Sequence, residues 1–231
     1  GLIDNLENIT TKNFKKEGNY IFVIGKTLGH LYQSEFYKVV LGISDGPSPN
    51  INLFNEKNNG LLVKKLISKK LISTVHDVSS GGILLALSEM CIGGKIGAKI
   101  KLPKSTINSH EYLFGEDQSR YIIEISEKNK KNVMKMLEEN SVYYDSIGKT
   151  HSDTLDLGKE LNIKIDELEK LNSSWFKRYF NENWFMSMKI EEIESLIKKA
   201  LPDAEIVIKD LAGDENHYSA TIKSKVFAGK S

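Results

Sequence analysis

Two short stretches of the 231-residue chain gather residue types that bind phosphates, amides or divalent cations. The first is His76-Asp77-Val78-Ser79-Ser80-Gly81-Gly82, where two glycines open a predicted helix. Paired glycines let backbone N–H groups approach an anion, and a helix N-terminus favours negative charge. Asp77, at the end of a predicted strand, is placed to bind a cation or a ribose. A structural alternative stays open, in which Ser79 or Ser80 caps the helix and Gly81-Gly82 is a tight turn.

The second stretch is Phe114-Gly115-Glu116-Asp117-Gln118-Ser119-Arg120, directly before an apolar strand. Glu116 and Asp117 offer the oxygen ligands that magnesium prefers. Gln118 can recognise an amide, and Arg120 can pair with a phosphate. The alternative is a solvated loop in which Glu116 and Arg120 form a weak surface pair.

Short apolar strands and amphipathic helices must position these stretches. The predicted strands are residues 20–25, 71–78, 98–102, 121–125 and 142–147. The predicted helices are a turn over 34–40 closed by Gly42, an amphipathic helix carrying Leu62, Leu66, Leu71 and Ile72, and residues 83–91 and 129–140. This alternation predicts an α/β or α+β domain with helices packed on a sheet.

The composition changes near residue 173. Residues 172–185 are aromatic and basic and show no clean periodicity. A helix over 190–201 and two strands over 205–211 and 217–224 are predicted beyond them. The 46 residues from 186 to 231 are too few for an independent core, so this second unit looks unfinished.

Composition excludes several classes of protein. The 32 basic and 31 acidic residues give a net charge of +1, which argues against nucleic-acid binding through a basic surface. A single cysteine, Cys91, excludes an internal disulfide, and the five histidines form no close metal-ligand pair. No apolar run reaches the ~20 residues that cross a bilayer, and because the first residues lack the basic and apolar regions of a signal peptide, we expect none. We therefore expect a cytoplasmic protein, either processed or an interior piece of a longer chain, since it starts with Gly1.

Five motifs resemble, in order, the C-terminal part of the large subunit of phosphoribosylformylglycinamidine synthases, over about residues 1–182. They are Gly1-Leu2-Ile3-Asp4, Phe14-Lys15-Lys16-Glu17-Gly18, Ser34-Glu35-Phe36, Val75 to Gly82, and Phe114 to Arg120. The resemblance implies that residues 1–42 end a second nucleotide-binding domain. It implies that residues 43–182 form an AIR synthase-like C-terminal domain, a mixed sheet covered by helices.

The resemblance also implies an activity. Members of this family are ATP-dependent ligases of purine biosynthesis that convert formylglycinamide ribonucleotide to the amidine with ammonia from a glutaminase subunit. Magnesium would neutralise the ATP phosphates. The implied partners are the missing N-terminal half, the glutaminase subunit and a small accessory subunit. The missing half holds the catalytic histidine and the main ATP site, so we expect this chain alone to be inactive.

The resemblance places substrate-side or nucleotide-side residues in the two stretches described above. They are Asp77, Ser79, Gly81, Gly82, Glu116, Gln118 and Arg120. Whether they are vestigial in this second copy or line an auxiliary site stays open. Tyr32-Gln33 and Ser80 depart from the family pattern, which usually has glycines and an acidic residue there. Another ATP-dependent enzyme of the AIR synthase fold is the alternative.

The end of the chain resembles the N-terminal half of BolA-like proteins. The matching residues are Ile190 to Leu201, Gly213 to Tyr218, and Phe227 to Ser231, which imply a truncated α-β-β unit over 183–231. Members of that family are adaptors that partner monothiol glutaredoxins in iron–sulfur cluster handling. His217 matches a family histidine, although a structural histidine that closes the hairpin is the favoured interpretation. The chain is then either a read-through of two neighbouring genes or a genuine fusion.

Overall fold

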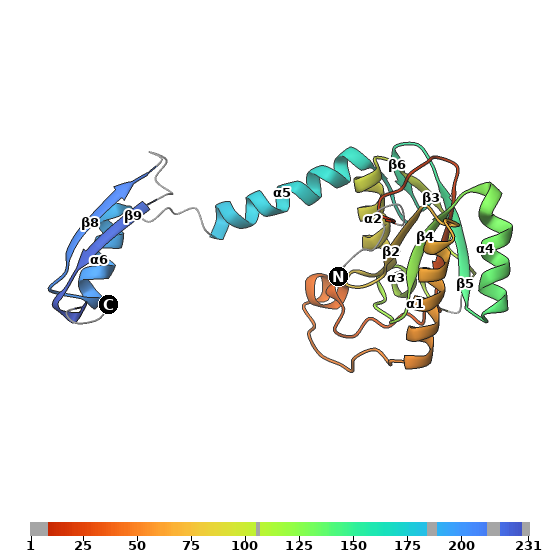
Figure 1. Ribbon diagram of the computed structural model, residues 1–231, viewed down its shortest axis with the longest axis horizontal. Helices are drawn as coiled ribbons and strands as arrows, with labels where there is room; N and C mark the ends of the chain where they lie inside the picture. The colour runs from red at the N-terminus through yellow and green to blue at the C-terminus, as the bar shows by residue number, and fades with distance from the viewer. Residues whose placement is uncertain (1–8, 105–106, 184–188, 212–217, 228–231) are drawn as a thin grey trace. The chain divides into compact units, whose positions relative to one another are not determined.

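A mixed seven-stranded sheet lies at the centre of the first of two units (Figure 1). The computed structural model describes residues 9–104, 107–183, 189–211 and 218–227, and its units are Gly1–Lys170 and Leu171–Ser231. The strand order is β2-β4-β1-β5-β3-β6-β7, antiparallel except between β3 and β6. The strands are β1 (Tyr20–Ile24), β2 (Thr74–Asp77), β3 (Ala98–Ile100), β4 (Tyr121–Ile125), β5 (Tyr144–Thr150), β6 (Thr154–Asp156) and β7 (Asn162–Lys164).

Helices cover both faces of this sheet, which confirms the predicted mixed sheet covered by helices. Helices α2 (Gly82–Gly94) and α3 (Ser109–Phe114) pack on the face that carries Ile21 and Val23 of β1. Helices α1 (Leu53–Ser68) and α4 (Glu127–Glu139) pack on the opposite face. Because β1 is buried on both sides, its sequence is continuously apolar rather than alternating.

Helix α1 corrects one prediction. Its N-cap is Asn52, whose side chain accepts a hydrogen bond from the Asn55 N–H, and its apolar face packs through Leu62 and Leu66. The helix ends at Ser68, so Leu71 and Ile72 lie outside it. Both contribute to the same apolar cluster from the connection to β2. Spacing alone placed them in the helix because the helix and this connection bury one common cluster.

Other elements differ from the predictions in type or extent. The predicted turn over 34–40 is a π-helix, Tyr37–Leu41, closed as expected by Gly42 with a φ of 68°. Helix α3 and strands β6 and β7 were not predicted, because they are short and surrounded by polar residues. Residues 172–183, without clean periodicity, belong to the 19-residue helix α5 (Ile165–Asn183). None of the helices in the described ranges is apolar and long enough to span a membrane.

The second unit contains helix α6 (Ile190–Ala200), the hairpin of β8 (Glu205–Asp210) and β9 (Tyr218–Lys223), and a 3-10 turn (Lys225–Phe227). This order agrees with the helix and two strands expected from the sequence. Within residues 189–211 and 218–227, Ala204 is the only buried residue. The described part of this unit therefore has almost no core of its own.

Helix α1 offers a matched test of the packing. Leu66 is fully buried, whereas Leu61 on the same helix is 56% exposed. We expect Leu66→Ala to destabilise the first unit by about 2–5 kcal/mol, because it removes apolar contacts and leaves a cavity. Leu61→Ala should cost less than about 0.5 kcal/mol. Hydrogen exchange of the β1 and β4 amides in increasing urea measures both values, and equal losses would contradict the assignment.

Candidate functional site

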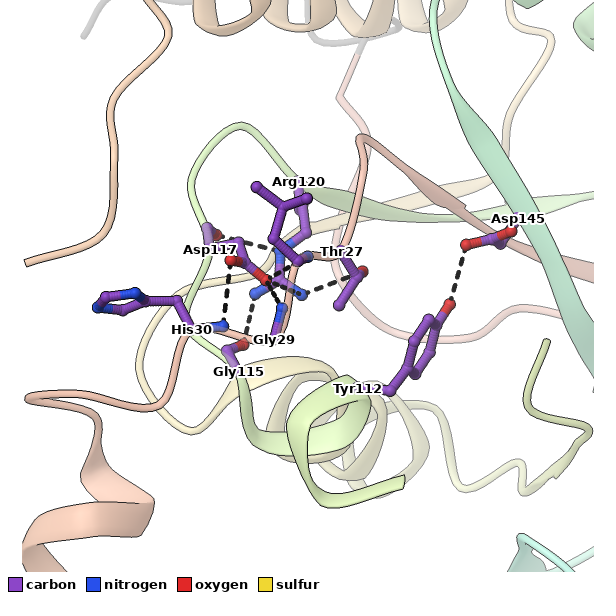
Figure 2. A network of polar contacts seen from close by, with 9 residues as sticks. Thr27, Gly29, His30, Tyr112, Gly115, Asp117, Arg120 and Asp145 are labelled. Carbon is purple, nitrogen blue, oxygen red and sulfur yellow. Dashed lines mark hydrogen bonds and ion pairs between the residues drawn. The ribbon is translucent and has the colours of Figure 1, made fainter. Parts of the chain in front are cut away.

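The carboxylate of Asp117 organises the centre of the candidate site (Figure 2). It accepts hydrogen bonds from the backbone N–H groups of Leu28 and Gly29, both at 2.9 Å, and from that of His30 at 3.2 Å. Three consecutive N–H groups form a concave cradle of the kind that binds anions. Here the anion is a side chain 88 residues further along the chain than Gly29. Asp117 thus fixes the loop after β1 against the connection between α3 and β4.

Arg120 completes this network with a buried guanidinium group. Its Nε donates to the Asp117 carbonyl oxygen at 3.1 Å, and its terminal nitrogens donate to Gly115 O and Thr27 Oγ1 at 2.5 and 3.3 Å. The guanidinium also lies 3.8 Å from the Asp117 carboxylate. Burial lowers the pKa of Arg120, and the charge of Asp117 opposes that shift. At 1% exposure, Arg120 is a buried structural cation and not a partner of Glu116 at the surface.

Gly25 makes this packing possible at the end of β1. Its φ is +90°, a conformation that favours glycine. A Cβ at this position would lie 2.4 Å from the Ser119 carbonyl oxygen and 3.1 Å from Arg120 Cγ. The strand can therefore approach the buried arginine only because residue 25 has no side chain.

Glu116 occupies the anion position at the start of α2. Its Oε1 accepts hydrogen bonds from the backbone N–H groups of Gly81 and Glu35, both at 2.8 Å. The N-cap of α2 is Gly81, with φ at 80° and no side-chain cap, so the expectation that Ser79 or Ser80 caps this helix is wrong. The carboxylate satisfies a free N–H group and complements the helix dipole. The neighbouring Gly82 leaves room for the carbonyl of Leu113, 2.6 Å from its hypothetical Cβ.

A third polar contact ties α3 to β5. The buried Tyr112 hydroxyl donates to Asp145 at 3.3 Å, as Figure 2 shows, and Tyr143 donates to the same carboxylate at 3.1 Å. Burial and the nearby charge of Asp145 both raise the pKa of Tyr112. Its phenol therefore stays protonated and acts as a donor.

Two of the cavities that open beside this network share Tyr32 and Gln118 in their walls. The smaller, of 280 Å³, is lined by Ser79, Ser80, Glu116 and Gln118 among others. The larger, of 670 Å³, is lined by polar residues from the loop after β1 and from the start of α1. Prominent among them are Lys26, His30, Asn50, Asn52, Asn55 and Asn59.

The structure thus brings together three of the residues singled out from the sequence, Ser79, Glu116 and Gln118, around one cavity. Arg120 is buried and lines neither cavity. His217 lies outside the described residues. The expected magnesium ligands Glu116 and Asp117 instead bind backbone N–H groups, and no group of three potential metal ligands occurs within the described ranges.

Asp77 lies apart from both cavities, at the exposed end of β2, with 71% of its side chain accessible. The Nδ1 atom of His76 lies 3.4 Å from its carboxylate. His76 Nε2 lies 2.9 Å from Glu89, which also binds Lys12 at 2.5 Å. Burial raises the pKa of Glu89, but its hydrogen bonds to Lys12 and His76 outweigh that effect and lower it.

The asparagines of the larger cavity were not among the predicted site residues, although their spacing carried a signal. Asn52, Asn55 and Asn59 follow each other at i, i+3 and i+7, which places them on one face of α1. Asn59 is 6% exposed and donates to the Ser119 carbonyl at 2.9 Å. A polar stripe at helical spacing next to the N-cap therefore marked the cavity wall.

Residues 16–156 match the family model for the AIR synthase related protein, C-terminal domain. The chain is 50% identical over 179 residues to the phosphoribosylformylglycinamidine synthase subunit PurL of Pelagibacter ubique, covering 78% of this chain and 24% of the relative. It is 37% identical over 183 residues to that of Azorhizobium caulinodans, covering 79% and 25%. The chain therefore spans about a quarter of the length of these curated relatives.

Solved structures share the fold at low identity. T. maritima PurL complexed with FGAR has a TM-score of 0.58 and 15% identity, covering 71% of this chain and 30% of that one. T. maritima PurL complexed with ATP has a TM-score of 0.56 and 16% identity, covering 71% and 27%. These likenesses support the architecture.

The Asp117 network predicts that substitutions at two adjacent residues will differ clearly in their effect on stability. Asp117→Asn removes the counter-charge of Arg120. It also replaces one of the two acceptor oxygens that face three N–H donors by an NH₂ group, so we expect the free energy of unfolding to fall by about 3 kcal/mol. Gln118→Ala, at an exposed position, should change stability by less than about 0.5 kcal/mol. Urea unfolding of the two variants tests this. An Asp117→Asn variant as stable as the parent would show that the network contributes little.

Proposed function

Because the chain belongs, through residues 16–156, to the family of the AIR synthase related protein, C-terminal domain, we propose that it is the C-terminal part of a phosphoribosylformylglycinamidine synthase. The observation that carries this proposal is the 50% identity to a PurL subunit over 179 residues. The proposed reaction uses ATP and glutamine-derived ammonia to convert formylglycinamide ribonucleotide to its amidine, forming a C–N bond in purine biosynthesis.

The proposed role of this segment is to shape one side of a ligand cleft. Ser79 and Gln118 would contact substrate or nucleotide, because both line the smaller cavity. Glu116, with Gly81 and Gly82, would hold the start of α2 in place. Arg120 would act indirectly, through Asp117 and the loop after β1. Asp77 would serve only a ligand that extends beyond both cavities.

The chemistry of the described residues bears on ATP and magnesium. The two anion-binding positions, at the start of α2 and at the cradle of residues 28–30, are filled by the protein's own carboxylates. Because Glu116 and Asp117 accept hydrogen bonds from backbone N–H groups, their oxygens are not free to bind a magnesium ion, and these residues do not fit one. The main ATP and magnesium sites would lie in the part of the synthase outside this sequence, and side chains here such as Ser79 and Gln118 would contact only the periphery of a ligand.

The proposed partners are the rest of the synthase, a glutaminase subunit and a small accessory subunit. One solved structure with a TM-score of 0.56 is named "Structure of PurLQS from Thermotoga maritima". Its name supports an assembly of this kind for the thermotogal protein, and we extend it to the complete synthase that would contain this segment.

Activity measurements test the proposal. The purified chain should show no ammonia-dependent turnover of formylglycinamide ribonucleotide with ATP, because it spans 24% of its relative. A graft that replaces the matching segment of the Pelagibacter ubique relative by residues 1–182 should regain turnover. Chromatographic quantification of the amidine product measures both, with the unmodified relative as the control. Turnover by the chain alone, or an inactive graft that is folded, would contradict the proposal.

For residues 183–231 we propose a truncated BolA-like unit. The order of α6, β8 and β9 supports it, as do the half-buried Ile190, Ile193 and Ile197 on one face of α6. A monothiol glutaredoxin is the partner this assignment would predict for a completed unit. The scarcity of buried residues in the described part argues that the truncated unit is not an efficient adaptor.

Co-purification tests this second proposal. The chain should bind weakly but measurably to an immobilised monothiol glutaredoxin, and an otherwise identical chain ending at residue 182 should not bind. Equal retention of the two chains would contradict a BolA-like contribution. The shorter chain is the control for binding by the synthase-like unit.

A further inference from the structure

Large apolar side chains project into solvent from the two segments that carry Tyr37 and residues 50–55 of the larger cavity's lining. Val39, Val40 and Leu41 belong to the first segment, Ile51, Leu53 and Phe54 belong to the second, and we call these six residues the apolar rim, with the two segments as its two sides. Each is at least 50% exposed, and Val39 and Leu53 reach 77%. Soluble proteins rarely gather this much exposed apolar surface around a cavity unless another surface covers it.

The rim is attached to a fixed framework. The π-helix that carries Val39, Val40 and Leu41 has no buried residue of its own. It is held just before its start, where Ser34 is fully buried and the Glu35 N–H binds Glu116. Phe36 also stacks on Phe114 with ring centroids 4.6 Å apart. The apolar side chains are thus presented from an anchored segment.

The loop between the two sides of the rim is also tied down. His30 Nε2 lies 3.0 Å from the Pro47 carbonyl oxygen, and Gln33 donates to the Gly46 carbonyl at 2.5 Å. Figure 1 shows this loop, residues 42–52, running along the outside of the first unit into α1. A surface ordered before binding loses little conformational entropy when a partner covers it.

We propose that the apolar rim is the docking surface for the part of the synthase that lies outside this sequence. The inference rests on the proposed function. The relatives of this chain have about three quarters of their length outside the matched segment. The complete synthase proposed above would therefore supply a large occupant within one polypeptide. Ile51 of the rim lines the larger cavity, as does Tyr37, which precedes Val39 by two residues. An occupant seated on both sides would therefore cover the cavity mouth and supply its remaining wall.

Cysteine labelling can test the rim, because the background is low. Cys91 is the only cysteine, is fully buried, and has a pKa that burial raises to about 12. A buried thiol that stays protonated reacts slowly with maleimide. Val40→Cys and Leu53→Cys place a reactive thiol on each side of the rim. Leu61→Cys is the matched control, on the same helix as Leu53, 56% exposed and outside the rim.

The three variants are labelled in the 231-residue chain and in the full-length graft into the Pelagibacter ubique relative, with peptide mass spectrometry as readout. We expect both rim cysteines to react rapidly in the chain and about tenfold or more slowly in the graft. Leu61→Cys should react at similar rates in both. Circular dichroism of each variant checks that the substitution leaves the fold intact.

Equal labelling of the rim cysteines in the chain and the graft would overturn the inference, as would equal protection of Leu61→Cys. Protection already present in the chain would also overturn it. In that case, a dimeric mass in light scattering would show that a second copy covers the rim. A monomeric mass would show that the chain's own residues cover it. Rim protection in a graft without turnover would support the inference while contradicting the proposed function.

Discussion

Two neighbouring carboxylates connect most of the candidate site. Glu116 and Asp117 accept hydrogen bonds from five backbone N–H groups in three segments, and these groups lie 35 to 89 residues away from the carboxylates in sequence. Arg120 supplies a buried counter-charge beneath them. Charge-assisted hydrogen bonds of this kind are about twice as strong as neutral ones. The positions of the loop after β1, of the turn before the π-helix and of the start of α2 all depend on this one connection between α3 and β4.

The sheet supplies the rigidity that this arrangement needs. Strand β1 pairs with β4 along its whole length, so the loop that leaves β1 and the connection that enters β4 meet at the same end of the sheet. At the other end, the fully buried Glu124 of β4 accepts bonds from the Lys15 and Lys16 N–H groups and from Asn19. One strand therefore anchors loops at both of its ends through buried charged side chains.

Much of the architecture could be predicted from local pattern. The apolar runs of β1 and β4 and the helical spacing in α2, α4 and α6 identified these elements, because burial on a sheet or helix face imposes a period on the sequence. The roles of Glu116, Asp117 and Arg120 could not be predicted in this way. A carboxylate before a strand looks the same whether it meets a metal ion, water or a backbone N–H group 88 residues away. Strands β6 and β7 also escaped, since three residues surrounded by polar ones do not stand out as an apolar run.

The asparagines along α1 have a consequence for how the larger cavity selects molecules. Carboxamide side chains do not titrate, and each offers both a donor and an acceptor. The part of the wall formed by Asn50, Asn52, Asn55 and Asn59 therefore distinguishes molecules by the arrangement of their donors and acceptors, whereas Lys26 in the same cavity responds to their charge. Contacts with such a wall vary little with ionic strength or with pH near neutrality, in contrast to contacts made through lysine or histidine.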